Sequence, residues 1–486
     1  MKTLKYIIDG IKIQKIVGDI NITIDNISNN SNNIKTNGLF IAKKGNRVDG
    51  HTYIDSAINN GAIAVLCSED INLPENITKI VVEDSIEAES FVAANFYDNP
   101  SKKLKIIGVT GTNGKTTTAT MIYQLLNNLG QKAGLISTIV YKYGNIELPA
   151  INTTPDAIEL NKLMNDMYLD GCKYAVMEVS SHAIVQKRIC GINFAGGIFT
   201  NITHEHLDYH GSFGNYIKAK KTFFDNLPTN AFALINIDDK NGKIMVQNTK
   251  AKIYTYGLSQ MADFHARIIE NTFQGLHLKI DGNDTWFLLL GRFNAYNILA
   301  AYSSAIILGF DKQEVLSQLS KIPPINGRFN IINNNDTYII IDYAHTPDAI
   351  ENILSTINEM DINGKIITVF GAGGNRDKTK RPLMGQIAAQ YSDIVIITSD
   401  NPRYEEPADI IADIEKGVPA NLNAKVFKIE DRADAIKMAI NLANKGDVIV
   451  IAGKGHETYQ EIKGIRNHFD DKEVVLQIIN SKKIIN

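Results

Sequence analysis

The last third of the chain repeats one pattern: a short apolar run, a polar cluster, and a stretch with helical spacing. The apolar runs are "TYIIIDYAH", "KIITVFGAGG", "DIVIITSDNP", "AKVFKIED" and "DVIVIAGKGHE". Strands that alternate with helices predict a doubly wound α/β fold with a parallel sheet. Ligands bind such sheets at the carboxyl ends of the strands, and four polar clusters stand there. These clusters are 342–345, 371–376, 400–403 and 453–457.

A chain of 486 residues is long enough for about three domains. Residues 1–103 hold short strand-like runs between Asn- and Gly-rich turns, which predicts a small α/β domain. Residues 104–327 open with an apolar run, a glycine turn and a periodic helix that ends at Gly130, which predicts a larger α/β domain. The helix breakers Pro323 and Pro324 then predict a boundary before a third domain, 328–486.

Charge and cysteine content narrow the possible partners. The formal net charge is −3, from 50 basic and 53 acidic residues, so no strong field attracts nucleic acid or an anionic membrane. The three cysteines form no CxxC pair and no disulfide framework, which favours a reducing cytoplasm. A membrane span needs about 20 consecutive apolar residues, and no apolar run in the sequence approaches that length. We expect a cytoplasmic monomer that binds small charged molecules.

The segment "GVTGTNGKTTT" stands between a predicted strand and a predicted helix. Backbone N–H groups in such a turn, together with a helix N-terminus, can hold phosphate oxygens. Lys115 would neutralise the β- and γ-phosphates of a nucleotide, and Thr116 would ligate Mg²⁺. Val109 stands where the usual phosphate loop has its first glycine, so the alternative is a glycine-rich turn that binds nothing. The remaining residues favour a nucleotide site.

Two further segments carry metal-ligand residue types. "YAVMEVSSH" puts Glu178 just after an apolar strand, where it can reach the magnesium of a phosphate loop; the alternative is a solvated acid. "TNITHEHLDYHG" is dense in His, Glu and Asp, as metal sites are. Asp208 stands where the second histidine of HExxH belongs, which disfavours a zinc hydrolase. A polar loop with hydrogen-bonded histidines is the alternative.

Taken in order, the motifs resemble those of the Mur ligases. They run through all three predicted domains: "TGTNGKTT", "NTTP", "MEVSSH", "TNITHEHLDYHG", "NGRF", "DYAHTPD", "GGNRDKTKRP", "DNPR" and "GKGHE". The short glycine spacing of the phosphate loop is similar to that family's version. The resemblance implies an N-terminal domain for a UDP-sugar nucleotide, a central ATPase domain, and a C-terminal Rossmann-like domain for the incoming amino acid.

Within the Mur ligases the motifs are most similar to those of the enzymes that add the third amino acid. This implies an ATP-dependent ligase that joins meso-2,6-diaminopimelate to UDP-N-acetylmuramoyl-L-alanyl-D-glutamate through an acyl phosphate. The implied process is peptidoglycan synthesis, and with it cell-wall biogenesis, cell shape and cell division. The implied cofactors are ATP and Mg²⁺.

The resemblance also implies the site residues. Lys115, Glu178, His206 and Lys220 would be catalytic, and a metal would be held by Thr116, Glu178, His206 and Lys220 as N6-carboxylysine. Carbamylation needs a lysine of lowered pKa; the alternative for Lys220 is a solvated helix face. The implied ATP contacts are Gly111, Thr112, Asn113, Gly114, Lys115, Thr116, Thr117, Asn294, Arg328, Asp342 and His345. The implied contacts of the UDP-linked substrate are Ser31, Asn46, Arg47, Val48, Asn152, Thr153, Thr154, Ser180, Gln186 and Arg188.

The resemblance implies that the "DNPR" motif recognises the incoming amino acid. A guanidinium can bind the distal carboxylate of a diamino diacid bidentately, whereas it would repel the ammonium of lysine. The alternative for Arg403 is a surface ion pair with Glu405 or Glu406, worth about 0 to 1 kcal/mol. The implied diaminopimelate contacts are Arg376, Asp400, Asn401, Pro402, Arg403, Gly453 and Glu457.

Other functions stay open at this point. A lysine-adding ligase belongs to the same family, and folylpolyglutamate synthetases share the "GTNGKT" loop. A phosphate-loop kinase or switch NTPase would use Lys115 and Glu178, but it leaves the polar strand ends of the third domain without a purpose. A catalytically lapsed binding protein is disfavoured because the implied catalytic residues are all present.

Overall fold

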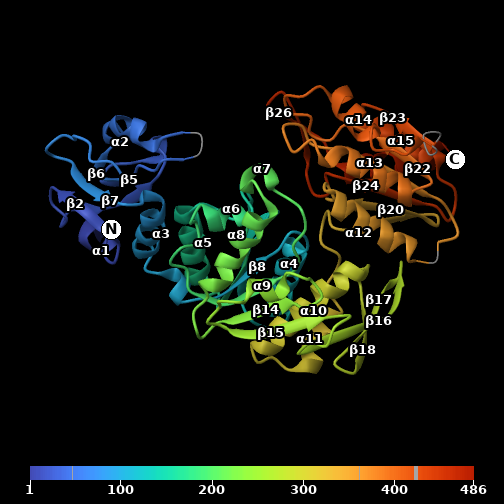
Figure 1. Ribbon diagram of the computed structural model, residues 1–486, viewed down its shortest axis with the longest axis horizontal. Helices are drawn as coiled ribbons and strands as arrows, with labels where there is room; N and C mark the ends of the chain where they lie inside the picture. Colours follow the sequence, from blue (N-terminus) through green and yellow to red (C-terminus); the bar gives the residue numbers. More distant parts are fainter. Residues whose placement is uncertain (46–47, 361, 421–424, 486) are drawn as a thin grey trace.

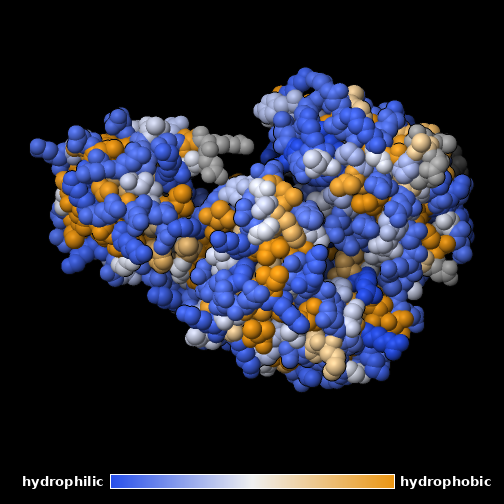
Figure 2. All heavy atoms as spheres, viewed as in Figure 1, coloured by the Kyte–Doolittle hydropathy of each residue, from blue (hydrophilic) through white to orange (hydrophobic). Residues whose placement is uncertain are grey.

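The computed structural model describes residues 1–45, 48–360, 362–420 and 425–485. The chain forms three parts in sequence order, blue, green to yellow, and orange to red in Figure 1. Each part is built on a sheet of its own and buries its own apolar clusters. The N-terminal and C-terminal parts stand apart above the middle part, and Figure 2 shows open space between them.

The N-terminal part has a five-stranded sheet with helices on both faces. Its inner strands are parallel apolar runs, as expected for strands buried on both faces. The sheet order is β2 (Ile13–Val17), β7 (Thr78–Val82), β6 (Ala62–Cys67), β5 (Gly38–Ile41) and β4 (Asn26–Ser28), with β2 antiparallel. The other elements are β1 (Lys2–Thr3), β3 (Thr23–Ile24), α1 (Leu4–Ile7), α2 (Ile54–Asn59), α3 (Ser85–Phe96) and the 3₁₀ turns η1 (Ser31–Asn33), η2 (Gly50–Tyr53) and η3 (Pro100–Lys102).

The middle part has an eleven-stranded sheet whose centre is parallel. The parallel strands, in sheet order, are β9 (Ala133–Ile136), β12 (Tyr174–Glu178), β8 (Lys105–Thr110), β13 (Phe194–Phe199), β14 (Phe232–Asn236) and β15 (Lys252–Gly257). One face is covered by α4 (Lys115–Asn128), α10 (Arg292–Ile307) and α11 (Lys312–Leu319). The other face is covered by α5 (Ala157–Leu169), α6 (Ser181–Val185), α8 (Phe213–Asp225) and α9 (Gly242–Met245), and α7 (Leu207–His210) precedes α8.

Both edges of this sheet were missed by the sequence analysis. One edge is the hairpin of β10 (Val140–Tyr143) and β11 (Ile146–Pro149). The other is β16 (Phe264–Thr272), β17 (Gly275–Ile280) and β18 (Asn283–Phe287), at the lower right of Figure 1. Their exposed faces mix polar residues with apolar ones, so they lack the continuous apolar runs that revealed the parallel strands.

The C-terminal part confirms the doubly wound prediction. All five predicted strands form and pair in parallel, in the order β20 (Thr337–Asp342), β24 (Val448–Ala452), β21 (Ile366–Phe370), β22 (Ile394–Ile397) and β23 (Val426–Lys428). β19 (Asn330–Asn334) adds an antiparallel edge. One face carries α12 (Pro347–Asn358), α13 (Lys380–Tyr391) and α14 (Pro407–Glu415), and the other carries α15 (Arg432–Leu442) and α16 (Asp471–Ile485). A hairpin of β25 (Tyr459–Ile462) and β26 (Ile465–His468) was not predicted.

Two local predictions are confirmed as well. α4 ends at Asn128 and Gly130 takes a left-handed φ of 72° just beyond it, so the glycine stops the helix as expected. No helix runs through 321–329, where the two prolines stand. The domain limits 103 and 327, the monomeric state and the cytoplasmic location stay predictions. Within the described residues, no helix is both long enough and apolar enough to cross a membrane.

An ion pair buried in the C-terminal part fixes the start of α16. Arg432 Nε lies 2.7 Å and Nη2 2.8 Å from the two carboxylate oxygens of Asp471, and both side chains are fully buried. The guanidinium also donates to the carbonyl of Ala452 at the end of β24. The pair therefore ties α15, α16 and β24 together.

We predict that Asp471→Ala lowers the free energy of unfolding by about 3–5 kcal/mol, because it leaves a guanidinium buried without its counter-charge. Denaturant unfolding followed by circular dichroism measures this. The control is Glu473→Ala two residues on, where an exposed pair with His468 is lost; it should cost about 0–1 kcal/mol. Equal, small losses in both variants would contradict the prediction.

Candidate active site

A cleft of about 1090 Å³ lies between the middle and C-terminal parts. Its walls bring together residues that the sequence analysis assigned to three different ligands. They are Thr112, Asn113, Gly114, Lys115, Thr116, Thr117, Asn152, Thr153, Thr154, Glu178, Ser180, Arg188, His206, Lys220, Arg328, His345, Arg376, Asp400, Asn401, Arg403, Gly453 and Glu457.

The phosphate loop joins β8 to α4 and is held against the end of β13. Thr112 N–H donates to the carbonyl of Asn201 at 2.8 Å, and Asn113 N–H donates to its side chain at 2.9 Å. A Cβ on Gly111 would lie 1.9 Å from Thr200 Oγ1, so only glycine allows this approach. Lys115 Nζ donates to the carbonyls of Gly111 and Thr112 at 2.9 and 2.7 Å. The loop is preformed, and the N-terminus of a 14-residue helix faces the cleft.

Glu178 is fully buried at the end of β12, so the alternative of a solvated acid is wrong. Thr138 N–H donates to Oε1 at 2.7 Å and its hydroxyl donates to Oε2 at 3.1 Å. Each carboxylate oxygen has a second lone pair, and Thr116 lines the same cleft. Carboxylate and hydroxyl oxygens are the ligands that Mg²⁺ prefers, so these residues fit a magnesium ion beside a bound phosphate.

Lys220 lies on α8 and points into the fold, so the alternative of a solvated helix face is wrong. Its side chain is 1% exposed. Nζ donates to the carbonyl of Gly111 at 2.7 Å and lies 4.7 Å from the centre of the Tyr216 ring. Burial, and then the charge of Lys115, lower the pKa of Lys220 well below its usual value. A neutral amine is the form that reacts with CO₂, so the site suits carbamylation.

The histidine-rich segment spreads over several environments. His206 takes a left-handed φ of 56° before α7, and its Nε2 lies 3.6 Å from the Glu205 carboxylate. His210 Nε2 is hydrogen-bonded to Ser181 Oγ at 2.9 Å, and His204 packs against the Phe213 ring. His206 lines the cleft, and so does His204.

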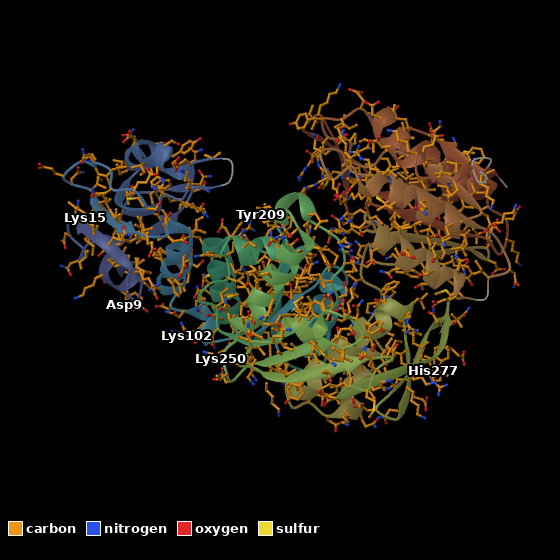
Figure 3. All side chains as sticks on the ribbon, viewed as in Figure 1. Asp9, Lys15, Lys102, Tyr209, Lys250 and His277 are labelled. Atoms are coloured by element: carbon orange, nitrogen blue, oxygen red, sulfur yellow. The ribbon has the colours of Figure 1, made fainter. Side chains whose placement is uncertain are left out.

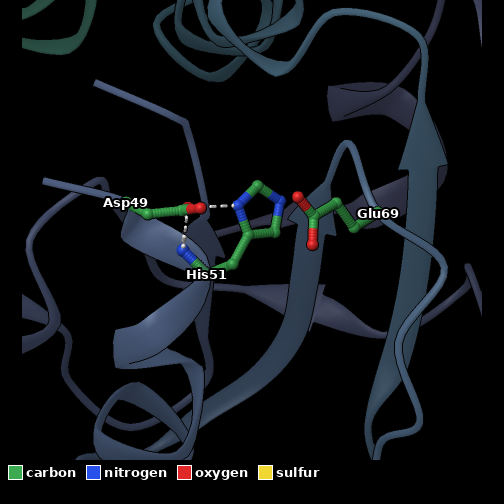
Figure 4. Close-up of side chains that lie close together, drawn as sticks. All are labelled: Asp49, His51 and Glu69. Carbon is green, nitrogen blue, oxygen red and sulfur yellow. Dashed lines mark hydrogen bonds and ion pairs between the residues drawn. The ribbon is translucent and has the colours of Figure 1, made fainter. Parts of the chain in front are cut away.

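Among the described residues, the three metal-ligand side chains that converge most closely lie elsewhere, in the N-terminal part. They are Asp49, His51 and Glu69 (Figure 4). His51 Nδ1 is 2.7 Å from Asp49 Oδ1, and its Nε2 accepts from Ser68 N–H at 3.2 Å. Both ring nitrogens have protein partners, and Asp49 also caps η2. The group therefore supports local structure.

Four of the residues predicted for the UDP-linked substrate, Thr154, Ser180, Gln186 and Arg188, form one network beside Glu178. Thr154 Oγ1 donates to the carbonyl of Glu178 at 2.7 Å, and Arg188 Nη1 donates to the carbonyl of Thr154 at 2.6 Å. Arg188 Nε donates to Gln186 Oε1, whose amide nitrogen in turn donates to Tyr209 OH at 3.2 Å. Figure 3 places Tyr209 on α7, at the side of the middle part that faces the open space.

The predicted uridine contacts lie in the N-terminal part. Ser31 opens η1 and is buried, while Val48 is exposed. Asn46 and Arg47 lie outside the described residues. The Asn30 side chain accepts from Asn32 N–H at 3.0 Å and so caps this turn.

The predicted adenosine-side residues line a second cavity of about 370 Å³, and five predicted ATP contacts line both this cavity and the cleft: Asn113, Gly114, Thr117, Arg328 and His345. Arg328 Nη2 donates to Thr116 Oγ1 at 3.3 Å, and its guanidinium lies 4.7 Å from the Tyr343 ring. Burial lowers the pKa of His345 to about 4, so this imidazole is neutral near pH 7. The remaining predicted contacts in this cavity are Asn294 and Asp342.

Arg403 does not pair with its acidic neighbours in sequence, so the alternative of a surface ion pair with them is wrong. Glu405 pairs with Arg381 and Lys378 at 3.0 Å, and Glu406 lies 3.7 Å from Lys463. Arg403 donates to the carbonyl of Gly374 at 2.8 Å, and its Nε lies 3.9 Å from Glu461.

Charged side chains of both signs line the cleft beside Arg403. Arg376 lines it, together with two buried or half-buried carboxylates. Asp400 Oδ2 is buried and has no hydrogen-bond partner among the described residues. Burial, and then the charge of Asp400, raise the pKa of Glu457. Two guanidinium groups beside two carboxylates complement a ligand end that carries both a carboxylate and an ammonium.

Asp348, Lys380 and Thr138 are among the cleft residues that were not assigned from the sequence. Asp348 accepts from Asn113 Nδ2 at 2.5 Å and from Thr203 Oγ1 at 3.2 Å, and so joins α12 to the phosphate loop. Lys380 donates to the carbonyl of His345 at 2.9 Å. Thr138 holds Glu178, as described above. Asp348 and Lys380 belong to the motifs "DYAHTPD" and "GGNRDKTKRP", and that membership was the available signal.

Three family models match the chain: the Mur ligase family catalytic domain over 23–104, the Mur ligase middle domain over 109–305, and the Mur ligase glutamate ligase domain over 327–455. A curated protein of Cytophaga hutchinsonii is 52% identical over 98% of this chain and 99% of its own length. The chain belongs to the Mur ligase family. That relative is named UDP-N-acetylmuramoyl-L-alanyl-D-glutamate--2,6-diaminopimelate ligase, as is one of Phocaeicola vulgatus, also 52% identical over 98% of this chain and 99% of its own.

A solved structure with the same name superimposes with a TM-score of 0.71 at 32% identity, covering 99% of each chain. The predictions of the Mur ligase family and of its three-part fold are therefore confirmed. The roles of individual residues in this Mur ligase stay predictions, and the cleft supports them by bringing most of the residues together.

We predict that Gly111→Ala weakens ATP binding by about 1–3 kcal/mol, because a Cβ cannot fit against Thr200 without shifting the phosphate loop. Isothermal titration calorimetry measures the affinity. The matched control is Gly214→Ala in α8, where the added Cβ meets nothing nearer than 3.9 Å; its affinity should equal that of the wild type. An unchanged affinity for Gly111→Ala would contradict the role of the loop.

Proposed function

We propose that the protein joins 2,6-diaminopimelate, as its meso form, to UDP-N-acetylmuramoyl-L-alanyl-D-glutamate in peptidoglycan precursor synthesis, driven by ATP. One observation carries the proposal: a single cleft has a phosphate loop on one wall and Arg403 with Arg376, Asp400 and Glu457 on the other. The names of relatives 52% identical to this chain support the same substrates.

The phosphate loop would hold the β- and γ-phosphates of ATP through its N–H groups and Lys115. Thr116 and Glu178 would hold Mg²⁺ there, and His206 with carbamylated Lys220 would hold a second ion. When bound, magnesium supplies positive charge that offsets the charge of the phosphates. Asn294, Arg328, Asp342 and His345 would contact the adenosine side. The neutral His345 adds no charge to that cavity.

The reaction needs no nucleophile from the protein, because the substrates supply both reacting groups. The D-glutamyl carboxylate takes the γ-phosphoryl group and ADP leaves, which gives an acyl phosphate. The deprotonated amine of the incoming amino acid attacks the acyl carbon, the C–N bond forms, and the C–O bond to phosphate breaks. The protein contributes position and charge, and a closed cleft keeps water from the acyl phosphate.

The C-terminal wall would read the amino acid. Arg403 and Arg376 would bind the distal carboxylate, and Asp400, Asn401 and Glu457 the distal ammonium. Lysine lacks this carboxylate, so it would offer the two guanidinium groups no anionic partner and would place its own positive charge beside them. The N-terminal part and the network around Arg188 would hold the UDP-linked substrate.

We predict that ATP, Mg²⁺ and UDP-N-acetylmuramoyl-L-alanyl-D-glutamate release phosphate only when a diamino acid is added. A coupled phosphate assay over a panel of meso-diaminopimelate, lysine and glutamate measures this. The highest kcat/KM should belong to meso-diaminopimelate. Phosphate release without an amino acid would indicate a switch NTPase, and a higher kcat/KM for lysine would overturn the specificity.

We predict that Arg403→Ala costs about 2–5 kcal/mol in kcat/KM for meso-diaminopimelate, the range for removing one partner of a desolvated charge pair. Steady-state kinetics at saturating ATP measures the loss. Arg466→Ala is the control, because Arg466 lies 3.9 Å from the same Glu461 but is largely exposed. An effect of Arg403→Ala no larger than that of Arg466→Ala would remove Arg403 from the substrate site.

We predict that Lys220→Ala lowers kcat by about 10²-fold or more, the usual effect of removing one well-placed charged group. If the missing group is a carbamate, a short carboxylate such as propionate should restore part of the rate, because it supplies the same oxygens. Lys218→Ala, an exposed lysine on the same helix, should keep full activity. A loss without rescue would indicate that Lys220 acts as an amine.

A further inference from the structure

Lys454 carries a charge buried in the C-terminal part, and the function proposed above gives it no role. It lies in the loop after β24, and its side chain is fully buried. Bringing a lone ammonium into the protein interior is costly, so its partners decide why it is there. Burial lowers the pKa of Lys454, while Asp400 and Glu457 act in the opposite direction.

The Lys454 ammonium donates its hydrogen bonds to residues of the C-terminal wall of the cleft, the wall that is proposed to bind the amino acid. Nζ donates to Asn401 Oδ1 at 3.1 Å and to the carbonyl of Tyr459 at 2.5 Å, and it lies 3.5 Å from Glu457 Oε2. Asn401 and Glu457 both line the cleft, whereas Lys454 is not among its lining residues. The lysine therefore stands behind the wall and touches two side chains that face the ligand.

These contacts determine which way the Asn401 amide points. Lys454 Nζ and the backbone N–H of Glu461 are donors, and both approach Asn401 Oδ1, at 3.1 and 2.8 Å. An ammonium and a backbone N–H can only donate, so the oxygen must face them. Asn401 Nδ2 must then face Glu457 Oε2, at 2.8 Å. Glu457 Oε1 has no hydrogen-bond partner among the described residues, so this oxygen is left for a ligand.

The "DNPR" loop, which carries Asn401, is also held by the β25–β26 hairpin. Gln460 Nε2 donates to the carbonyl of Asp400 at 2.8 Å, and Arg403 N–H donates to the carbonyl of Glu461 at 3.0 Å. The hairpin holds the main chain of the "DNPR" loop. Lys454, in contrast, contacts the side chains of Asn401 and Glu457, which are proposed to bind the ligand.

We propose that Lys454 is a positioning residue for the incoming amino acid, which orients Asn401 and Glu457 so that together they receive the ammonium at its distal end. The proposal rests on the proposed function. It assigns Lys454 an effect on the affinity for the amino acid, through Asn401 and Glu457, and none on the chemistry of the acyl phosphate.

The test is steady-state kinetics of Lys454→Met, which keeps the volume and length of the side chain and removes its charge and donors. KM for meso-diaminopimelate should rise by about 10- to 100-fold, the range for losing a group that orients ligand-binding side chains. kcat and the KM values for ATP and the UDP-linked substrate should change by less than about threefold, because only binding of the amino acid is affected. The control is Lys463→Met, which replaces an exposed lysine in the turn of the β25–β26 hairpin; it should leave all constants unchanged.

A combined variant separates positioning from general packing. If Lys454 acts through Asn401 and Glu457, then Lys454→Met added to Asn401→Ala/Glu457→Gln should raise KM for meso-diaminopimelate no further than Asn401→Ala/Glu457→Gln does alone. Should Lys454→Met fail to bind ATP as a folded protein does, Lys454→Gln, which is neutral but retains a donor group, takes its place, and KM for meso-diaminopimelate should then rise by a smaller factor.

Two outcomes would overturn the proposal. One is an unchanged KM for meso-diaminopimelate in Lys454→Met, and the other is a parallel loss of all three substrate affinities in both variants, which would indicate a purely structural role. A failed proposed function looks different, because the wild type itself would then release no phosphate in response to meso-diaminopimelate.

Discussion

The carboxyl ends of parallel strands lie at one end of their sheet, and in this protein two such ends face each other across one cleft. β8, β12 and β13 bring the phosphate loop, Glu178 and the supporting residues Thr200 and Asn201 to the first end. β20, β24, β21 and β22 are consecutive in the second sheet and bring the four polar clusters to the other. The alternation of strand and helix thus places the loop predicted to bind phosphate and the residues predicted to bind the amino acid at strand ends, and both groups line one cleft.

Buried cations hold the loops of this cleft in place. Arg381 pairs with Glu405, Arg432 with Asp471, and Lys454 with Asn401 and Glu457. Each joins a strand end to a helix or hairpin that lies far away in sequence. A buried cation tolerates few arrangements of its partners, because any arrangement that leaves it unpaired is costly. Such residues favour one conformation of the loops, as the proposed recognition of a carboxylate by two guanidinium groups requires.

Much of the architecture could be predicted from the sequence, because continuous apolar runs and glycine turns are local signals. The five parallel strands of the C-terminal part and the end of α4 at Gly130 are examples. The partners of charged side chains could not be predicted in this way. Arg403 stands beside Glu405 in sequence, yet Glu405 turns to Arg381, 24 positions earlier. Lys220 reads as one of three lysines on a helix, and only the packing of α8 against β8 shows that it is buried.

The two walls of the cleft are also joined directly. Asp348 is the second residue of α12 and accepts from Asn113 Nδ2 in the phosphate loop, while Arg328 donates to Thr116 from the segment that enters the C-terminal sheet. Burial raises the pKa of Asp348, whose side chain is only partly exposed. These two hydrogen bonds hold the phosphate loop against the C-terminal part. In the proposed reaction an acyl phosphate must meet an amine before it meets water, so the two walls that would hold the reacting groups have to lie close together.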